Sequence, residues 1–528
     1  MLTIGNVSQT RIVALLMTMQ EVGVAPGTSP RTIGASSSRT GRTIWHTAVY
    51  MGGLIASRGA MLLLLPVITR ILDAQYTLYD LCMTTVLFLN PFLNLGLQSS
   101  VVRYYFHYET PAEQRSFYNT SVIFLIAISV PTVGLLFYFS RDLSGLLFQD
   151  ASRPELFRLT VMISALTALS LQPLALLRAQ EKTFTYSLLQ LVRGFAGPGS
   201  IFVLLVVFRL GISGILWGEL IGLLVLTAAG TAVSWRWLYP VFDFKKLKPL
   251  LAFGLPLLPV GVGGALLTVS DRYILRSHLS LEAMAPYSLG FRVGMALSLL
   301  IQALQLSWIP SALNLAKSGS KASIAKSVLA LQLLLFGMAM ATAVFAPELV
   351  RVFAPGKVFI GAHAIIPWIA FSYAIHGVVV LIGAAFAIAR RTAWSSLAFC
   401  SAGAAKVGLS LLFIPRYGIM GAAVTTLVAF IFELGLCYFI AQRVYRLPFD
   451  IRRLLATYAF SAVGFVGVLL AFSLPPAASL AFRVLLLALF CAASYFIILT
   501  ASDRRAVWQS IGNHCRRVQV SLAGQPHS

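Results

Sequence analysis

Long apolar stretches separated by short polar segments run through most of the chain. Apolar runs of roughly 20 residues recur from about residue 44 to residue 500. Each run is long enough to cross a hydrocarbon core about 30 Å thick, because a helix rises about 1.5 Å per residue. The short alternation typical of an outer-membrane β-barrel is absent. The pattern predicts an all-α polytopic membrane protein with about fourteen transmembrane helices, at roughly 44–69, 77–104, 115–140, 156–178, 183–208, 211–238, 249–276, 284–310, 326–348, 360–389, 391–414, 417–442, 452–474 and 479–501.

The composition agrees with a membrane protein. Only 11% of the 528 residues are charged and the mean hydropathy is +0.84, whereas soluble proteins are about 25% charged. A net charge of +23 would suggest nucleic acid as a partner for a soluble protein. Here about 25 of the 40 Lys and Arg fall in tails and loops on one side of the predicted membrane and about 10 on the other. Since positive loops stay inside, we expect no nucleic acid and both termini in the cytoplasm, with attraction of anionic lipid as a lesser role.

The two ends of the chain differ from the rest. Residues 1–43 are rich in Ser, Thr, Gly and Arg, and we expect a flexible cytoplasmic tail there, unless translation starts downstream of Met1; a cleaved signal peptide fits the pattern less well. Residues 502–528 are expected to form a basic cytoplasmic tail. The five cysteines include no C-x-x-C pair, which argues against a metal site or a disulfide framework.

The chain repeats part of itself about 207 residues apart. "RLGISGILWGEL" (209–220) resembles "RYGIMGAAVTTL" (416–427), and "TRILDAQYTLYDL" (69–81) loosely matches "RSHLSLEAMAPYSL" (276–289), with Tyr79 opposite Tyr287. Two pairs with one offset indicate duplication of a six-span unit. Because six is even, both copies have the same topology, as in transporters that bind substrate between two lobes. We expect an N-lobe at 44–240 (helices 1–6), a C-lobe at 241–445 (helices 7–12) and two extra helices at 446–501.

Four segments carry a family resemblance. "LPVITRILDAQYTLYDL", "LNLGLQSSVVRYY", "SDRYILRSHLSLEAMAPYSLGFRV" and "LLFIPRYGIMGAA" resemble the polysaccharide-biosynthesis flippases of the multidrug/oligosaccharidyl-lipid/polysaccharide exporter superfamily, which also contains O-antigen and lipid II flippases. The resemblance covers essentially residues 44–500. It implies two six-helix lobes around a central cavity, and a glycan on an undecaprenyl-type diphosphate turned from the cytoplasmic to the outer leaflet.

The resemblance also implies the surroundings of the protein. It places the chain in the bacterial cytoplasmic (inner) membrane, where it supplies surface polysaccharide such as lipopolysaccharide or exopolysaccharide by alternating access. The implied partners are the lipid-linked oligosaccharide, membrane lipids, and the polymerase and glycosyltransferases of the same pathway. It implies no enzymatic activity and no cofactor, with coupling to H⁺ or Na⁺ left open.

Ionisable side chains inside the predicted spans are the candidate functional residues. Such groups cost about 2.5–3.5 kcal/mol each on insertion scales and therefore suggest function. The cations outnumber the acids, as an anionic diphosphate would require. They are Arg58, Arg193, Arg272, Arg292, Lys406, Asp80, Glu219, Asp271 and Glu433.

Four of the cations are candidate substrate-binding residues. Arg58 and Arg292 match arginines of the lipid II flippases in position, so the resemblance implies substrate contact. The planar fork of Arg292 also matches phosphate oxygens. Arg193 and Lys406 are further candidates. A structural ion pair is the alternative for Arg58, with Asp80 as the partner, and for Arg292, at the interface between the repeats. For Arg193 the alternative is a side chain that extends to the cytoplasmic interface.

The remaining charges are candidates for gating or ion coupling. Asp80 resembles an acidic residue of the lipid II flippases, and Glu219 and Glu433 are candidates for H⁺ or Na⁺ coupling. Asp271 and Arg272 close an apolar run at the predicted outer end of a span. Because adjacent helical residues point about 100° apart, we expect them not to pair with each other, and expect Asp271 to reach a basic residue of the N-lobe; interfacial anchoring is the alternative.

The role of His376 and two alternative functions of the protein remain open. His376 lies centrally in a predicted span and titrates near neutral pH when unperturbed, although a lone histidine is more often a hydrogen-bonded core residue. A cation-coupled drug exporter of the same superfamily is the alternative transporter, disfavoured because the first span has Arg58 and no acid. A membrane polysaccharide polymerase or ligase is the alternative from another class, disfavoured by short loops without catalytic motifs.

Overall fold

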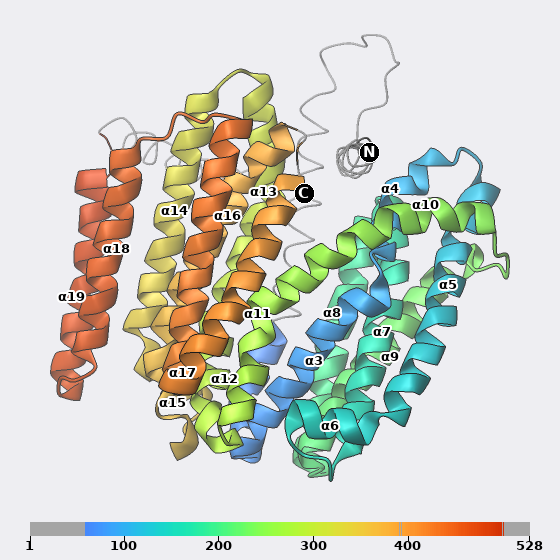
Figure 1. Ribbon diagram of the computed structural model, residues 1–528, viewed down its shortest axis with the longest axis horizontal. Coiled ribbons are helices and arrows are strands. Elements are labelled where there is room, and N and C mark those ends of the chain that lie inside the picture. The colour runs from blue at the N-terminus through green and yellow to red at the C-terminus, as the bar shows by residue number, and fades with distance from the viewer. Residues whose placement is uncertain (1–58, 390, 392, 499, 501–528) are drawn as a thin grey trace, which may run out of the picture.

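The computed structural model describes residues 59–389, 391, 393–498 and 500, and it is helical throughout its membrane-spanning length (Figure 1). Twelve helical stretches of this part are long and apolar enough to cross a membrane. The chain is therefore an all-α, multi-pass integral membrane protein, as predicted from the apolar runs.

The number of continuous stretches is smaller than the fourteen predicted spans. Two stretches, Gly59–Asn94 and Ser396–Val444, each cover parts of two predicted spans, and non-helical backbone separates the two parts of each stretch. The first contains a 3₁₀ turn at Asp73–Gln75, where Asp73 has φ +47°. The second changes direction at Gly418, whose φ is +55°.

The described helices fall into an N-terminal and a C-terminal bundle, on the right and left of Figure 1. In the N-terminal bundle α3 packs on α7, and α7 and α8 pack on α9. In the C-terminal bundle α17 packs on α11 and α16, and α16 packs on α12, α13 and α14. The helices are α3 (Tyr76–Asn94), α4 (Leu97–Tyr104), α5 (Pro111–Tyr138), α6 (Ser140–Phe148), α7 (Pro154–Ala179), α8 (Thr183–Phe202), α9 (Gly211–Val233), α10 (Phe244–Gly254), α11 (Leu258–His278), α12 (Leu281–Gly294), α13 (Leu297–Lys317), α14 (Lys321–Val344), α15 (Ala346–Phe353), α16 (Ala362–Ile388), α17 (Ala393–Val444), α18 (Ile451–Ala471) and α19 (Pro476–Ala493).

Two interrupted helices cross at their breaks. The chain leaves α3 through Leu95 and Gly96, with φ of +49° and +69°, and α10 gives way to α11 through the 3₁₀ turn Leu255–Leu257. A Cβ on Gly96 would lie 2.5 Å from the carbonyl oxygen of Gly254, and a Cβ on Gly254 would lie 2.4 Å from that of Leu95. Only glycine permits this approach, so the two breaks fix the crossing of the bundles' long helices.

The sequence repeat has a counterpart in backbone geometry. Gly211 begins α9 with φ +57°, and Gly418, 207 residues later, bends α17 with φ +55°. Three residues on, Gly214 and Gly421 press against the preceding carbonyls of Leu204 and Phe413, where a Cβ would come within 3.1 and 2.7 Å. The repeated sequence thus places a glycine with positive φ, and a closely packed glycine three residues later, at corresponding positions of the two copies. The lobe boundaries stay a prediction.

The last two helices are fastened by a buried arginine. Arg483 of α19 is 2% exposed and donates to both carboxylate oxygens of Glu348 on α15, at 3.0 Å each. It also donates to the carbonyl of Val344 at the end of α14. A charge on an otherwise lipid-exposed helix is thereby satisfied on the bundle side.

Candidate translocation cavity and gate

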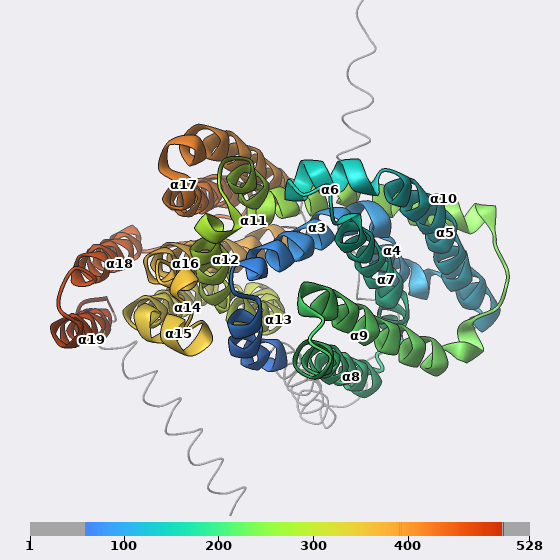
Figure 2. The same cartoon turned by 90° about the horizontal axis from the view of Figure 1, so that it is seen from below.

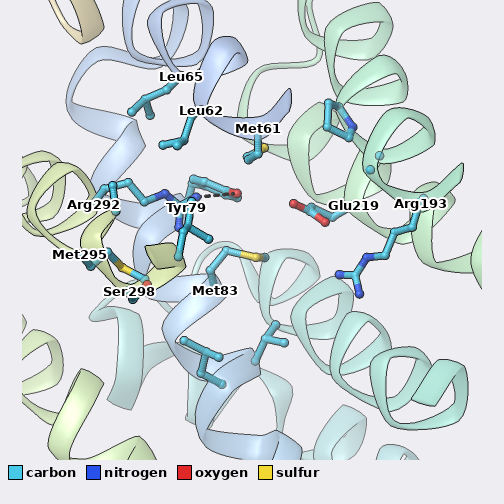
Figure 3. Close-up of a pocket in the computed structure, with 18 of the residues that line it drawn as sticks. Met61, Leu62, Leu65, Tyr79, Met83, Arg193, Glu219, Arg292, Met295 and Ser298 are labelled. Carbon is cyan, nitrogen blue, oxygen red and sulfur yellow. Dashed lines mark hydrogen bonds between the residues drawn. The ribbon is translucent and has the colours of Figure 1, made fainter. Parts of the chain in front are cut away.

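A cavity of about 470 Å³ lies where the two bundles face each other (Figure 3). Its lining comes from the helical segment that precedes α3, from α3, α8 and α9, and from α12 and α13. Methionine and leucine side chains make up the apolar part of the wall. In Figure 3, Arg292 and Tyr79 lie on one side and Glu219 and Arg193 on the other.

Arg292 brings a guanidinium from α12 to this cavity. Its Nη2 donates to the hydroxyl of Tyr79 at 3.3 Å, and its guanidinium carbon lies 5.8 Å from the centre of that ring. Among the described residues no carboxylate lies within ion-pair distance of Arg292. Tyr79 holds the side chain without neutralising it, so the positive charge is available to an anion that enters the cavity.

Arg193 and Glu219 charge the opposite wall. They come from α8 and α9, which touch backbone to backbone: a Cβ on Gly222 would lie 2.6 Å from the Cα of Gly197. That contact places both half-buried side chains on one face of the N-terminal bundle. Within the part of the chain that the structure describes, they make no ion pair with each other. The predicted residues Arg193, Glu219 and Arg292 are thus brought together, while Arg58 lies outside the described residues.

A buried ion pair joins the bundles beside the cavity. Nε of Arg272 on α11 donates to Oδ2 of Asp80 on α3 at 2.8 Å, and both side chains are less than a tenth exposed. The guanidinium carbon of Arg272 lies 4.0 Å from the centre of the Phe291 ring. The structure therefore connects two predicted gating residues that are 192 positions apart in the chain.

Asp271 differs from the prediction in both of its contacts. Nη1 of Arg272 donates to its Oδ1 at 3.3 Å, so the adjacent residues do pair. Cβ directions diverge by about 100°, but a long arginine side chain can turn back to reach its neighbour. The cation that Asp271 reaches is also not in the N-terminal bundle: Nζ of Lys406 on α17 lies 2.7 Å from Oδ2.

Lys406 does not line the cavity. The sequence places it among the substrate-binding candidates, whereas the structure buries it fully between α17 and α11. Tyr287 and Thr426 donate hydrogen bonds to the same Asp271 carboxylate, at 2.5 and 3.3 Å. Lys406 is therefore the counterion of Asp271 within the C-terminal bundle.

Further hydrogen bonds hold the bundles together at the end where α6, α12 and α15 lie, at the bottom of Figure 1. Thr77 donates to the carbonyl of Leu281 at 3.0 Å, and Tyr273 donates to Thr85 at 2.9 Å. Arg276 donates to the carbonyl of Phe148 at 2.9 Å, where the negative end of the α6 dipole favours a cation. Seen from below in Figure 2, α3 lies beside α11 and α12. This end of the molecule is closed.

Glu433 has a partner that the sequence does not indicate. Its Oε2 lies 3.2 Å from Nδ1 of His376, which links α17 to α16. The lone histidine is thus half of an acid–histidine pair in the C-terminal bundle, apart from the cavity lining.

Two tyrosines contact the candidate charged residues, and the charge-based search did not select them. Tyr79 orients Arg292, and Tyr287 hydrogen-bonds Asp271. The repeat alignment sets these two residues opposite each other, which was the available signal. Because tyrosines are common in membrane proteins, residue type alone does not single out Tyr79 and Tyr287. Their matching positions in the repeat do.

Comparison with known proteins gives a family for the chain and a known fold for its structure. A family model described as polysaccharide biosynthesis protein matches residues 45–316. No curated protein sequence matches the chain significantly. The fold resembles the lipid II flippase MurJ in an inward closed conformation, with TM-score 0.62 and 14% identity over 87% of this chain and 99% of that one.

Two MATE transporters share the same fold. A mutant of the Vibrio cholerae MATE transporter VcmN has TM-score 0.56 and 16% identity over 77% of this chain and 97% of that one. An inward-facing multidrug resistance MATE family transporter of the MOP superfamily has TM-score 0.56 and 12% identity, over 82% of this chain and 98% of that one. At these identities the likeness establishes the fold.

Proposed function

The chain belongs to the polysaccharide biosynthesis protein family, and on that premise we propose that it flips a polyprenyl-diphosphate-linked oligosaccharide across the bacterial cytoplasmic membrane. The glycan is strongly hydrated and the diphosphate is anionic, so neither enters hydrocarbon unaided. A polar, cationic chamber between two bundles carries this head group while the lipid tail stays in the bilayer. The observation that carries the proposal is the cavity with Arg292 on its wall and no carboxylate paired to it.

The cavity supports binding of a phosphate-containing head group. Arg292 offers several donors in a plane, which suits phosphate oxygens, and Arg193 contributes a second guanidinium from the other bundle. Gln190 and Ser298 add uncharged polar atoms to the lining, which suit sugar hydroxyls. A diphosphate held between Arg292 and Arg193 contacts both bundles at once. Its binding can therefore change how the two bundles are positioned relative to each other.

The closed end supports alternating access. With Asp80 and Arg272 paired, the bundles are joined on one side of the cavity, and we assign that side to the outer leaflet by the positive-inside rule. The substrate then enters from the cytoplasmic side. Release requires that the Asp80–Arg272 pair and the Thr77–Leu281 bond open while the cytoplasmic side closes, which makes these contacts the outer gate.

The proposal is tested by surface polysaccharide display in cells that depend on this protein. Arg292→Ala is expected to reduce display at least tenfold while the protein still inserts and accumulates, because the cavity wall loses its charge without leaving an unpaired buried carboxylate. Arg292→Lys is expected to rescue only part, since an ammonium lacks the planar fork. Arg178→Ala, an exposed arginine at the end of α7, is the matched control.

The drug-exporter alternative is separated by the same strains. If Arg292→Ala leaves polysaccharide display intact and instead lowers resistance to a cationic dye, the flippase assignment is wrong. Glu219, the acid of the cavity wall, would then be the expected cation-binding residue.

A further inference from the structure

The C-terminal bundle contains a titratable pair that neither the cavity nor the gate uses. His376 lies midway along α16 and Glu433 near the middle of the second half of α17. Nδ1 of His376 is 3.2 Å from Oε2 of Glu433. The Glu433 side chain is 2% exposed and that of His376 is 23% exposed. Ionisable groups at this depth are costly, and chains of acids and histidines there mark proton pathways.

We propose that His376 and Glu433 form a proton-binding site in the C-terminal bundle. The pair holds one proton in its uncharged form, whether written as imidazolium and carboxylate or as imidazole and carboxylic acid. One more proton gives an imidazolium beside a carboxylic acid with a net charge of +1. No covalent bond changes, and because Nδ1 faces Glu433, Nε2 is the ring nitrogen that exchanges the proton with the surroundings.

Aromatic rings prepare the site for the charged form. The His376 ring centre lies 5.1 Å from that of Phe430, 6.1 Å from that of Phe399 and 6.4 Å from that of Tyr373. A cation beside an aromatic ring is attracted by the electrons of the ring face. The neighbouring rings, Phe430 above all, therefore accommodate an imidazolium.

The other charged and titratable groups of the packed helices are accounted for elsewhere. On α11 and α17, Asp271, Arg272 and Lys406 neutralise one another and Asp80, and Arg292 of α12 points to the cavity. Lysines of α13 and α14 lie at helix ends, and Tyr458 of α18 packs its ring on Phe336. These lysines are Lys317, Lys321 and Lys326. The remaining titratable side chains of these helices are of types that ordinarily carry no charge at neutral pH, namely Tyr287, Tyr373, Cys437 and Tyr458.

A proton bound here is close enough to influence the gate. The Tyr373 ring lies between His376 and Phe291, 6.1 Å from the latter, and Phe291 is the ring on which Arg272 rests. Two aromatic side chains thus separate the new charge from the guanidinium that holds Asp80. Gain of one positive charge on this side raises the electrostatic cost of keeping Arg272 and Lys406 where they are.

Infrared difference spectroscopy on the purified full chain in lipid nanodiscs tests the site without any substrate. Between about pH 8 and about pH 5, the range in which an ordinary histidine changes charge, the wild type is expected to gain a protonated-carboxyl band. The band should be absent in Glu433→Gln. His376→Phe should keep the carboxyl protonated at both pH values and so remove its pH dependence.

Matched controls identify the band. Glu282→Gln removes an exposed carboxyl at the start of α12, and His363→Asn removes a histidine from the first turn of the same helix as His376; both are expected to keep the band. If Glu433→Gln is poorly folded, Glu433→Asp is used, and a shifted band is expected. An unchanged band in these Glu433 variants would overturn the proposal.

Discussion

Several buried polar contacts of the described helices meet at Asp271. It is fully buried and accepts from Arg272, Tyr287 and Thr426, with the Lys406 ammonium 2.7 Å away. A buried carboxylate of this kind is tolerated only with paired charge and several hydrogen bonds. Removing the Lys406 ammonium alone leaves the buried Asp271 carboxylate without its nearest cation. Removing both the ammonium and the carboxylate leaves no such unpaired charge.

A double-mutant comparison on this pair separates a structural role from a substrate-binding role. Lys406→Met is expected to destabilise the protein by about 3–5 kcal/mol, the usual cost of orphaning one buried charge, and Asp271→Asn combined with Lys406→Met should recover part of that loss. Thermal unfolding in detergent measures both. Lys317→Met, an exposed lysine at the end of α13, should change nothing. Unaltered stability of Lys406→Met with lost polysaccharide display would restore the substrate role suggested by the sequence.

At this scale the sequence identified the charged residues but not their partners. Asp80, Arg272 and Arg292 stand out because charges are rare in apolar runs, and all three lie at the cavity or gate. Their partners come from distant helices, and no local spacing connects Asp80 to Arg272 or His376 to Glu433. The position of Lys406 inside the bundle also depends on how α17 is rotated against α11, which its mixed apolar sequence does not specify.

At the level of helices, special backbone positions decide the geometry. Gly96 and Gly254 permit two broken helices to cross in backbone contact, and Gly211 and Gly418 both have a positive φ. The apolar runs predicted most helices within a few residues. They could not show the non-helical dihedral angles at Asp73 and Gly418, within Gly59–Asn94 and Ser396–Val444, because hydropathy carries no information about single dihedral angles.

Crosslinking across the outer gate tests the alternating movement of these helices. In a background with the natural cysteines replaced, Thr77→Cys and Leu281→Cys join α3 to the start of α12, where Thr77 Oγ1 lies 3.0 Å from the Leu281 carbonyl. A short bifunctional thiol reagent is expected to lock the gate and abolish polysaccharide display, with restoration by a cleaving reductant. Each single cysteine is the control. Full display by crosslinked protein would show that the gate need not open.

The whole molecule combines a closed end, a charged cavity and two bundles joined by few ion pairs. In the proposed function the polar cavity holds the hydrated head group, and the Asp80–Arg272 pair closes one end of the molecule at the same time. The sequence repeat predicted a site between two similar halves. The closed end was not predictable from sequence, because it depends on contacts between residues far apart in the chain.

The central claim is that this protein moves a lipid-linked glycan to the outer leaflet. The most direct measurement is the reaction of that glycan with a membrane-impermeant oxidant in spheroplasts, with the protein present, depleted, or replaced by Arg292→Ala. Lipid-linked glycan is expected to react when the wild-type protein is present and to accumulate in protected form in the other two cases. Equal reaction in depleted and wild-type spheroplasts would contradict the account.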